Sequence, residues 1–363
     1  MSKKRLYFID AVRAFAILMM LQGHFIDTLL DVSYRDESKT AFWVWKYFRG
    51  ITAPTFFTIS GLIFSYLLMR AKNNGNIEQR MRKGCNRGLM LIGIGYLLRV
   101  PIFRWLSGRF NSCFLIVDVL QCIGLSLIII VIIYKLTCKK TLVFSIVMLM
   151  LGMLVFLTEP LYRYLELPNV PLIFSNYFTK TNGSIFTILP WFGYMAFGAF
   201  ISTLFYRYLE RPRFKLAIVS GFFICGLFLI FKSSWLFNRL YFALNIELFK
   251  DVAYYNYLFT RLGNVLVLFS VFYLLEKYIR QSLILRIGQK TLSIYVIHFI
   301  VIYGSFTGIG LRHLIGKTLT PWQAVIGALV FLTSVCFISF YYARTNAFVY
   351  SGIRKIVDKI KRI

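Results

Sequence analysis

Two ionisable residues stand inside the first long apolar segment of this chain, Arg13 and His24 in FIDAVRAFAILMMLQGHFIDTLL. An arginine in a transmembrane helix costs about 2.5 to 3.5 kcal/mol on insertion scales, so such a residue usually faces a protein interior or a wet cavity. Eleven residues of α-helix bring His24 back to within about 20° of Arg13, roughly 16 Å further along the axis. The spacing therefore predicts that both side chains face the same interior.

These two residue types suit different chemistry. Imidazole titrates near pH 6.5, roughly where a general base is useful, and Asp27, one turn beyond His24, is placed to fix its tautomer as a carboxylate does in a triad. The alternative for His24 is a buried polar group satisfied by a neighbouring helix. The guanidinium of Arg13 suits phosphate oxygens, and its alternative is a structural ion pair with Asp10 or Asp118.

The elements that position these residues are predicted by hydropathy. The chain is 58% hydrophobic with a mean hydropathy of +0.68, which excludes an ordinary soluble domain. We predict an all-α polytopic membrane protein with about ten transmembrane helices in one bundle, and a single integral-membrane domain over residues 1–363, because no long soluble region or linker interrupts the apolar runs. The predicted spans are 9–30, 51–69, 88–106, 114–134, 141–158, 185–206, 216–232, 257–275, 291–309 and 322–343.

Charge predicts the orientation. The net charge is +28, and with a cytoplasmic N-terminus 26 of the 42 Lys and Arg residues fall on the cytoplasmic side and 14 on the opposite side, while Arg13 and Arg261 lie within spans. We therefore expect both termini in the cytoplasm, an outer segment at 159–184 that caps the outer face, and residence in the inner (plasma) membrane of the cell. The basic loops fit anionic membrane lipid, whereas nucleic acid is a poor partner because no soluble fold presents a basic patch.

Cysteine and histidine usage predicts no metal. The six cysteines show no paired spacing, the three histidines are far apart, and no nucleotide-binding glycine pattern is present. Disulfides and a zinc site are not expected.

Five segments together carry a family resemblance: RLYFIDAVRAFAILMMLQGHF, FRGITAPTFFTISGLIFSYLL, DVLQCIGLSL, ILPWFGYMAFGAFIS and IGQKTLSIYVIHF, in this order across about 300 residues. In them the chain resembles the heparan-alpha-glucosaminide N-acetyltransferase-like proteins of the transmembrane acyltransferase superfamily. The arginine, ten residues and a histidine of the first segment are also similar to a signature of the related membrane polysaccharide O-acyltransferases.

The resemblance implies an acyltransferase that moves an acyl group, acetyl first, from cytoplasmic acyl-CoA to a carbohydrate or glycolipid acceptor at the outer face. On this interpretation His24 and Asp27 are catalytic, and Arg13 and Arg87 bind the CoA co-substrate. No metal is expected to take part.

The remaining candidates have weaker signals. Asp118 and Gln121 lie one helical turn apart and can hydrogen-bond the acceptor or position His24, although a helix cap is an equal alternative for Asp118. Arg87 can also be an anchoring charge. His298 is expected to make a polar packing contact, with donor binding as the second role, and Arg261 is an interior charge with Asp118 or Asp251 as partner.

Two other function classes remain open. A secondary transporter would also have about ten spans and interior charges, although no repeat of the first five spans is visible in the second five. A lipid or glycan flippase would need no intramembrane histidine. The oligomeric state, a homodimer included, is not indicated by the sequence.

Overall fold

The computed structural model describes residues 6–360, and these residues form helices joined by turns, with one isolated backbone bridge between Leu30 and Leu319. The predicted all-α class is therefore confirmed. The long helices are α1 (Tyr7–Leu29), α2 (Thr40–Asn73), α3 (Ile77–Arg99), α5 (Val119–Leu136), α6 (Thr141–Leu157), α9 (Ile188–Tyr208), α10 (Phe214–Phe231), α13 (Tyr257–Leu274), α15 (Thr291–Tyr303) and α17 (Pro321–Ile360). Shorter helices are α4 (Ile102–Leu106), α7 (Glu159–Tyr162), α8 (Leu172–Ser175), α11 (Ser233–Leu244), α12 (Glu247–Tyr254), α14 (Ser282–Gln289) and α16 (Leu311–Leu314).

Fewer helices have the length and composition of a membrane span than the ten that the sequence predicted. Every predicted span falls on a helix, but among the described residues seven helices are long and apolar enough to cross a membrane, or eight if the bent pair α14 and α15 is one span. Two predicted spans do not qualify in either count. The one at 88–106 covers the second half of α3, which carries five Lys and Arg residues, and the separate short helix α4. The one at 141–158 falls on α6, which has 17 residues.

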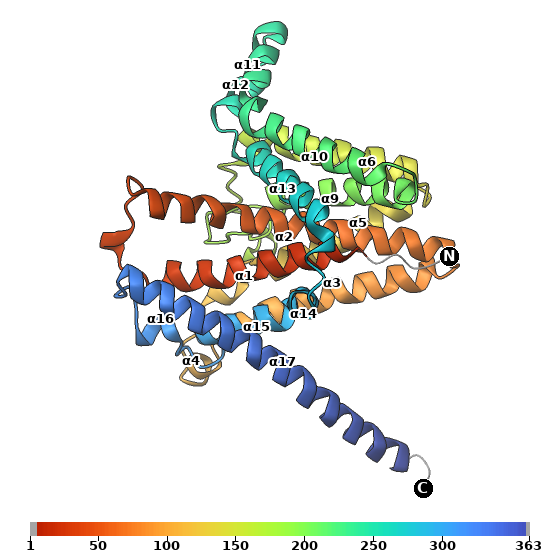
Figure 1. Cartoon of the computed structure of the whole chain (residues 1–363). Helices are drawn as coiled ribbons and strands as arrows, with labels where there is room; N and C mark the ends of the chain where they lie inside the picture. The colour runs from red at the N-terminus through yellow and green to blue at the C-terminus, as the bar shows by residue number, and fades with distance from the viewer. Residues whose placement is uncertain (1–5, 361–363) are drawn as a thin grey trace.

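Both of these helices nevertheless pack within the bundle (Figure 1). α3 lies antiparallel to α5, with Gly88 and Gly124 so close that a Cβ on Gly88 would stand 2.6 Å from the carbonyl oxygen of Gly124. α6 lies antiparallel to α9, where the hydroxyls of Ser145 and Thr203 are 2.7 Å apart. Their partners α5 and α9 both qualify as spans.

Small residues set the close helix pairs elsewhere too. A Cβ on Gly61 of α2 would overlap the carbonyl of Met195 in α9, and a Cβ on Gly226 of α10 would lie 2.7 Å from the carbonyl oxygen of Gly263 in α13. Such contacts are typical of membrane bundles, where helices associate by van der Waals packing because the lipid removes the hydrophobic driving force.

α1 and α15 run parallel to one another. Arg13 contacts Thr291 at the start of α15, and His24 contacts Tyr303 at its end. The short helix α14 precedes α15 and meets it at a bend of 70°. Gly288 of α14 packs against the backbone of Asp10 in α1. The bend therefore places α15 along the face of α1 that carries both predicted functional residues.

The segment at 159–184 packs on the bundle, over the ends of α3 and α5. Its Asn176 donates to the carbonyl of Leu115 at 2.9 Å, Ser184 accepts from the backbone N–H of Val117, and Tyr177 meets Tyr96 of α3. It therefore covers one end of the bundle, although the side of the membrane on which that end lies remains a prediction.

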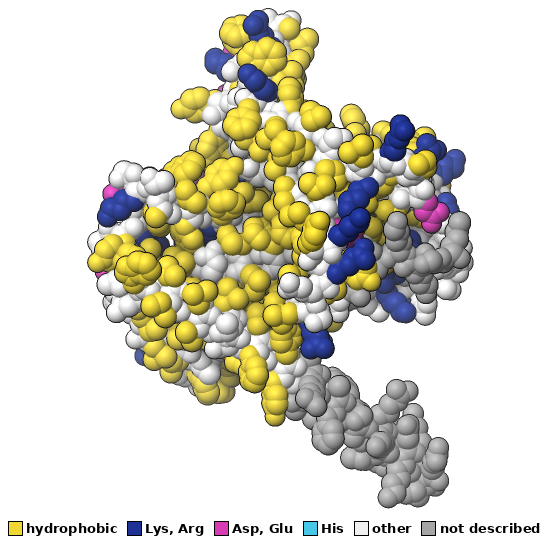
Figure 2. All heavy atoms as spheres, in the orientation of Figure 1, with side chains coloured by type: hydrophobic (Ala, Val, Ile, Leu, Met, Phe, Trp, Pro, Cys, Tyr) yellow, Lys and Arg dark blue, Asp and Glu magenta, His cyan; other side chains and the backbone are white. Residues whose placement is uncertain are grey.

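The surface agrees with a membrane setting. One face is largely covered by hydrophobic side chains, and most of its Lys and Arg side chains lie toward the end at which α1 begins (Figure 2). The chain ends that enter the topology prediction, residues 1–5 and 361–363, lie outside the described residues.

Candidate active site

A histidine pair lies between α1 and α15. His24 Nδ1 is 2.9 Å from the Tyr303 hydroxyl, and the His24 ring centroid is 5.3 Å from that of His298. His24 is partly accessible, whereas His298 is completely buried. The predicted base therefore has a polar partner, and a second imidazole lies beside it.

His298 is held mainly by aromatic packing. Tyr295 lies edge-on to it with centroids 4.9 Å apart, and Phe299 packs at 6.1 Å. Among the described residues neither ring nitrogen of His298 has a side-chain hydrogen-bond partner. The expected packing contact is thus present, but it leaves the polar atoms of the ring without a side-chain partner.

The structure does not bring Asp27 onto the ring of His24. The Asp27 carboxylate forms an ion pair with Arg49 of α2, and the backbone carbonyl of Asp27 accepts from Arg35 at 2.7 Å. Tyr303 instead occupies the position next to His24 Nδ1 that the sequence suggested for a carboxylate. Asp27 therefore joins α1 to α2 close to His24.

Arg13 and Arg87 line one cavity. It lies between α1, α2, α3, α5 and α15, has a volume of about 50 Å³, and is otherwise mostly apolar, with Ser60, Thr291 and Tyr295 as its other polar lining residues. Arg13 donates to Thr291 at 2.7 Å, and its other terminal nitrogen is 3.9 Å from the Asp10 carboxylate. Of the two partners that the sequence left open for Arg13, the structure places Asp10 near it and pairs Asp118 elsewhere.

The electrostatics of this cavity favour an anion. Two guanidinium groups at one cavity repel each other, and both are strong donors for phosphate oxygens. A volume of about 50 Å³ accommodates a few waters or an acetyl group, because a cavity needs about 10 to 15 Å³ of such space to hold one water. A longer ligand has to widen the cavity to enter.

Asp118 and Gln121 have structural partners. Gln121 accepts a hydrogen bond from the backbone N–H of Asp118 at 3.2 Å in a capping box that begins α5, and the Asp118 carboxylate forms an ion pair with Arg99 of α3. The cap that the sequence left open for Asp118 is present. Acceptor binding by these two residues stays a prediction.

Arg261 pairs with α2, and the structure shows neither acidic partner expected for it. Its guanidinium donates to the Tyr47 carbonyl at 3.1 Å and lies over the Tyr47 ring, 5.2 Å from the centroid. The glycine at position 50 leaves room for this guanidinium, because a Cβ there would lie 2.5 Å from it. Arg261 thus joins α13 to α2.

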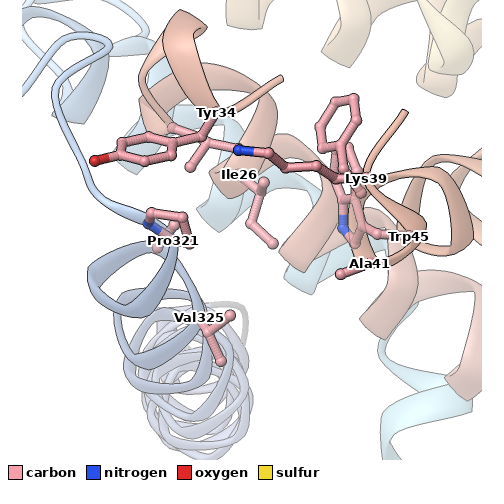
Figure 3. Close-up of a pocket in the computed structure, with 10 residues that line it drawn as sticks. Ile26, Tyr34, Lys39, Ala41, Trp45, Pro321 and Val325 are labelled. Atoms are coloured by element: carbon pink, nitrogen blue, oxygen red, sulfur yellow. The ribbon is translucent and has the colours of Figure 1, made fainter. Parts of the chain in front are cut away.

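A groove of about 240 Å³, larger than the arginine cavity, lies at the C-terminal end of α1 (Figure 3). Ile26, Trp45, Pro321 and Val325 contribute to its mainly apolar lining, and the Lys39 side chain extends toward Tyr34. His24 and His298 are not among the residues that line it. The groove is therefore separate from the histidine pair.

Sequence reasoning missed Tyr303, Tyr295 and Thr291. Tyr295 and His298 both occur in SIYVIHF, one helical turn apart, so their contact could have been inferred from helix spacing. The contact of Tyr303 with His24 joins residues 279 positions apart and carries no local signal.

Comparison with known families agrees with this architecture. The catalytic family model described as heparan-alpha-glucosaminide N-acetyltransferase, catalytic, matches residues 5–237, well over half of the chain. The match includes Arg13, His24 and Arg87, whereas His298 and Tyr303 lie beyond it. A search of curated proteins gave no match.

The fold and the family match together define a membrane acyltransferase. More particularly, the chain belongs to the heparan-alpha-glucosaminide N-acetyltransferase catalytic family. The resemblance noted from the sequence is thereby confirmed.

Proposed function

We propose that the protein transfers an acyl group, most simply acetyl, from cytoplasmic acyl-CoA to a hydroxyl or amine of a carbohydrate or glycolipid acceptor at the outer face of the membrane. The observation that carries the proposal is the arrangement along α1: a cavity with two arginines at one depth and a histidine pair about 16 Å further along the helix. The family match gives the reaction class.

The donor is assigned to the arginine cavity. Arg13 and Arg87 supply charge for an anionic group of CoA, and Thr291 orients the Arg13 guanidinium. The acyl end then extends along α15 past Tyr295 toward His24. The rest of the donor lies toward the basic end of α3, which we place on the cytoplasmic side.

His24 is the proposed base. In the tautomer with Nδ1–H donating to the Tyr303 oxygen, Nε2 carries the lone pair and can take the acceptor proton as the new bond forms. Tyr303 thus orients the ring, and the Asp27–Arg49 pair fixes α1 against α2 close to it. Asp118 and Gln121, at the start of α5, are kept as the acceptor-side candidates.

The test is a transfer assay with purified protein. Radiolabelled acetyl-CoA is incubated with a panel of amino sugars, neutral sugars and membrane glycolipids, and released CoA thiol is measured alongside labelled product. We expect thiol and product in equal amounts, and a loss of about 10²- to 10⁴-fold in rate for His24→Ala with unchanged acetyl-CoA affinity. The matched control is His313→Ala, because His313 lies in α16 and lines no part of the arginine cavity.

Absence of transfer with every acceptor, or parental turnover by His24→Ala, would contradict the proposal. A gradient-driven substrate flux without CoA release would favour the transporter alternative.

A further inference from the structure

His298 is the one histidine with no solvent exposure, and it is buried beside the proposed base with no side-chain partner for either ring nitrogen among the described residues. A buried polar group costs free energy where no hydrogen-bond partner satisfies it. The backbone carbonyls of Ile294 and Tyr295, on the same helix, are the acceptors near this ring. The same ring lies 5.3 Å from His24, between centroids. The ring of His298 therefore lies beside the place where the reaction is proposed to occur.

Tyr295 lies between the donor cavity and this ring. Tyr295 lines the cavity together with Arg13 and Arg87, and it packs edge-on against His298. An acyl group that extends from the arginines toward His24 passes Tyr295 and then meets His298. Three aromatic rings pack against the imidazole of His298: those of His24, Tyr295 and Phe299.

We propose that His298 donates its ring N–H to the carbonyl oxygen of the thioester and stabilises the oxyanion of the transition state. This inference rests on the proposed acyl transfer. It gives the two histidines different roles: His24 moves the proton, and His298 binds the oxygen on which negative charge develops.

The step balances as follows. The acceptor oxygen or nitrogen attacks the thioester carbon, and its proton passes to His24 Nε2. The carbonyl oxygen becomes negative and accepts a hydrogen bond from the N–H of neutral His298. When the intermediate collapses, the carbon–sulfur bond breaks and His24 gives its proton to the CoA sulfur. His298 ends in the state in which it began, so no further proton source is needed.

The assignment is tested with three proteins: the parent, His298→Phe and His298→Gln. The Phe variant removes the donor and keeps a planar ring, whereas the Gln variant retains an amide N–H. We expect His298→Phe to lower kcat by about 10²- to 10³-fold, with the Kd for acetyl-CoA changed by less than about threefold. His298→Gln should recover at least about tenfold of the lost kcat.

A spectroscopic readout separates this role from packing. A CoA analogue with a ketone in place of the thioester binds without reacting, and its carbonyl stretch is recorded by infrared spectroscopy. In the parent we expect the stretch at lower frequency than for the free analogue, with the shift lost in His298→Phe and partly kept in His298→Gln.

Three results would overturn the inference: an unshifted carbonyl in the parent, parental kcat in His298→Phe, or equal losses in the Phe and Gln variants. The first needs no variant, so it decides the matter even if His298→Phe does not fold. If the parent transfers acetyl and His24→Ala does not, any of these three results concerns His298 alone. A parent without transfer activity refutes the proposed function instead.

Discussion

Replacing Tyr303 by Phe tests which group orients the base. The change removes one hydroxyl, the one 2.9 Å from His24 Nδ1, and keeps the ring that packs against Phe299 at 4.8 Å. In the transition state His24 gains positive charge, and a hydrogen bond to a charged group contributes about 1.5 to 3 kcal/mol. At 1.36 kcal/mol per tenfold change, kcat should fall by about 10- to 150-fold.

The matched comparison is Asp27→Asn. Its ion pair with Arg49 is partly exposed, with 27% of the Asp27 and 44% of the Arg49 side chain accessible. Such pairs contribute about 0 to 1 kcal/mol, so we expect at most about a fivefold change in kcat and a small decrease in melting temperature.

Both variants are assayed for kcat, for acetyl-CoA Kd by calorimetry and for melting temperature on the same preparations. The sequence alone suggested Asp27 for this role. A large kcat loss in Asp27→Asn together with parental turnover in Tyr303→Phe would therefore refute the structural assignment and restore the carboxylate.

Further predictions concern donor binding, packing and topology. Arg13→Ala and Arg87→Ala should each weaken binding of a non-hydrolysable acetyl-CoA analogue in calorimetric titration, because both line the cavity. Arg239→Ala should not, because Arg239 is exposed in α11, away from the cavity and from the basic end of α3; equal affinity in all three variants would remove the donor site. Gly226→Ala should destabilise the protein by about 1 to 3 kcal/mol through overpacking, seen as a lower melting temperature. Gly221→Ala in the same helix meets nothing within 4 Å and should leave it unchanged, so equal melting temperatures would argue against the α10–α13 contact. In a cysteine-free background, Asn169→Cys should be labelled by an impermeant thiol reagent from outside and Asn74→Cys only after permeabilisation; the reverse pattern would invert the topology.

The sequence predicted the helices better than it predicted their partners. Hydropathy located every long apolar segment, because lipid requires about 20 consecutive apolar residues. It overcounted the spans because α3 combines an apolar half with a basic half, and because α6 is short. The 70° bend before α15 depends on packing against α1 and has no comparable signal.

The candidate site was predictable where one helix carries it. Helical periodicity placed Arg13 and His24 on a common side of α1, and the structure finds both against α15. The partners of these residues come from distant parts of the chain, so Thr291, Tyr303 and the ion pair of Asp27 with Arg49 could not be inferred from spacing. The helix cap at Asp118, by contrast, could be inferred from the sequence, because Asp is a preferred residue at the position where a helix begins.

Acyl transfer across the membrane is the central claim, and reconstitution in sealed vesicles tests it most directly. Labelled acetyl-CoA is placed on the side of the basic loops and an impermeant acceptor sugar on the other. We predict acetylated sugar on the acceptor side and free CoA on the donor side in a 1:1 ratio, with both lost in His24→Ala. Product on the donor side alone, or sugar movement without CoA release, would contradict the account.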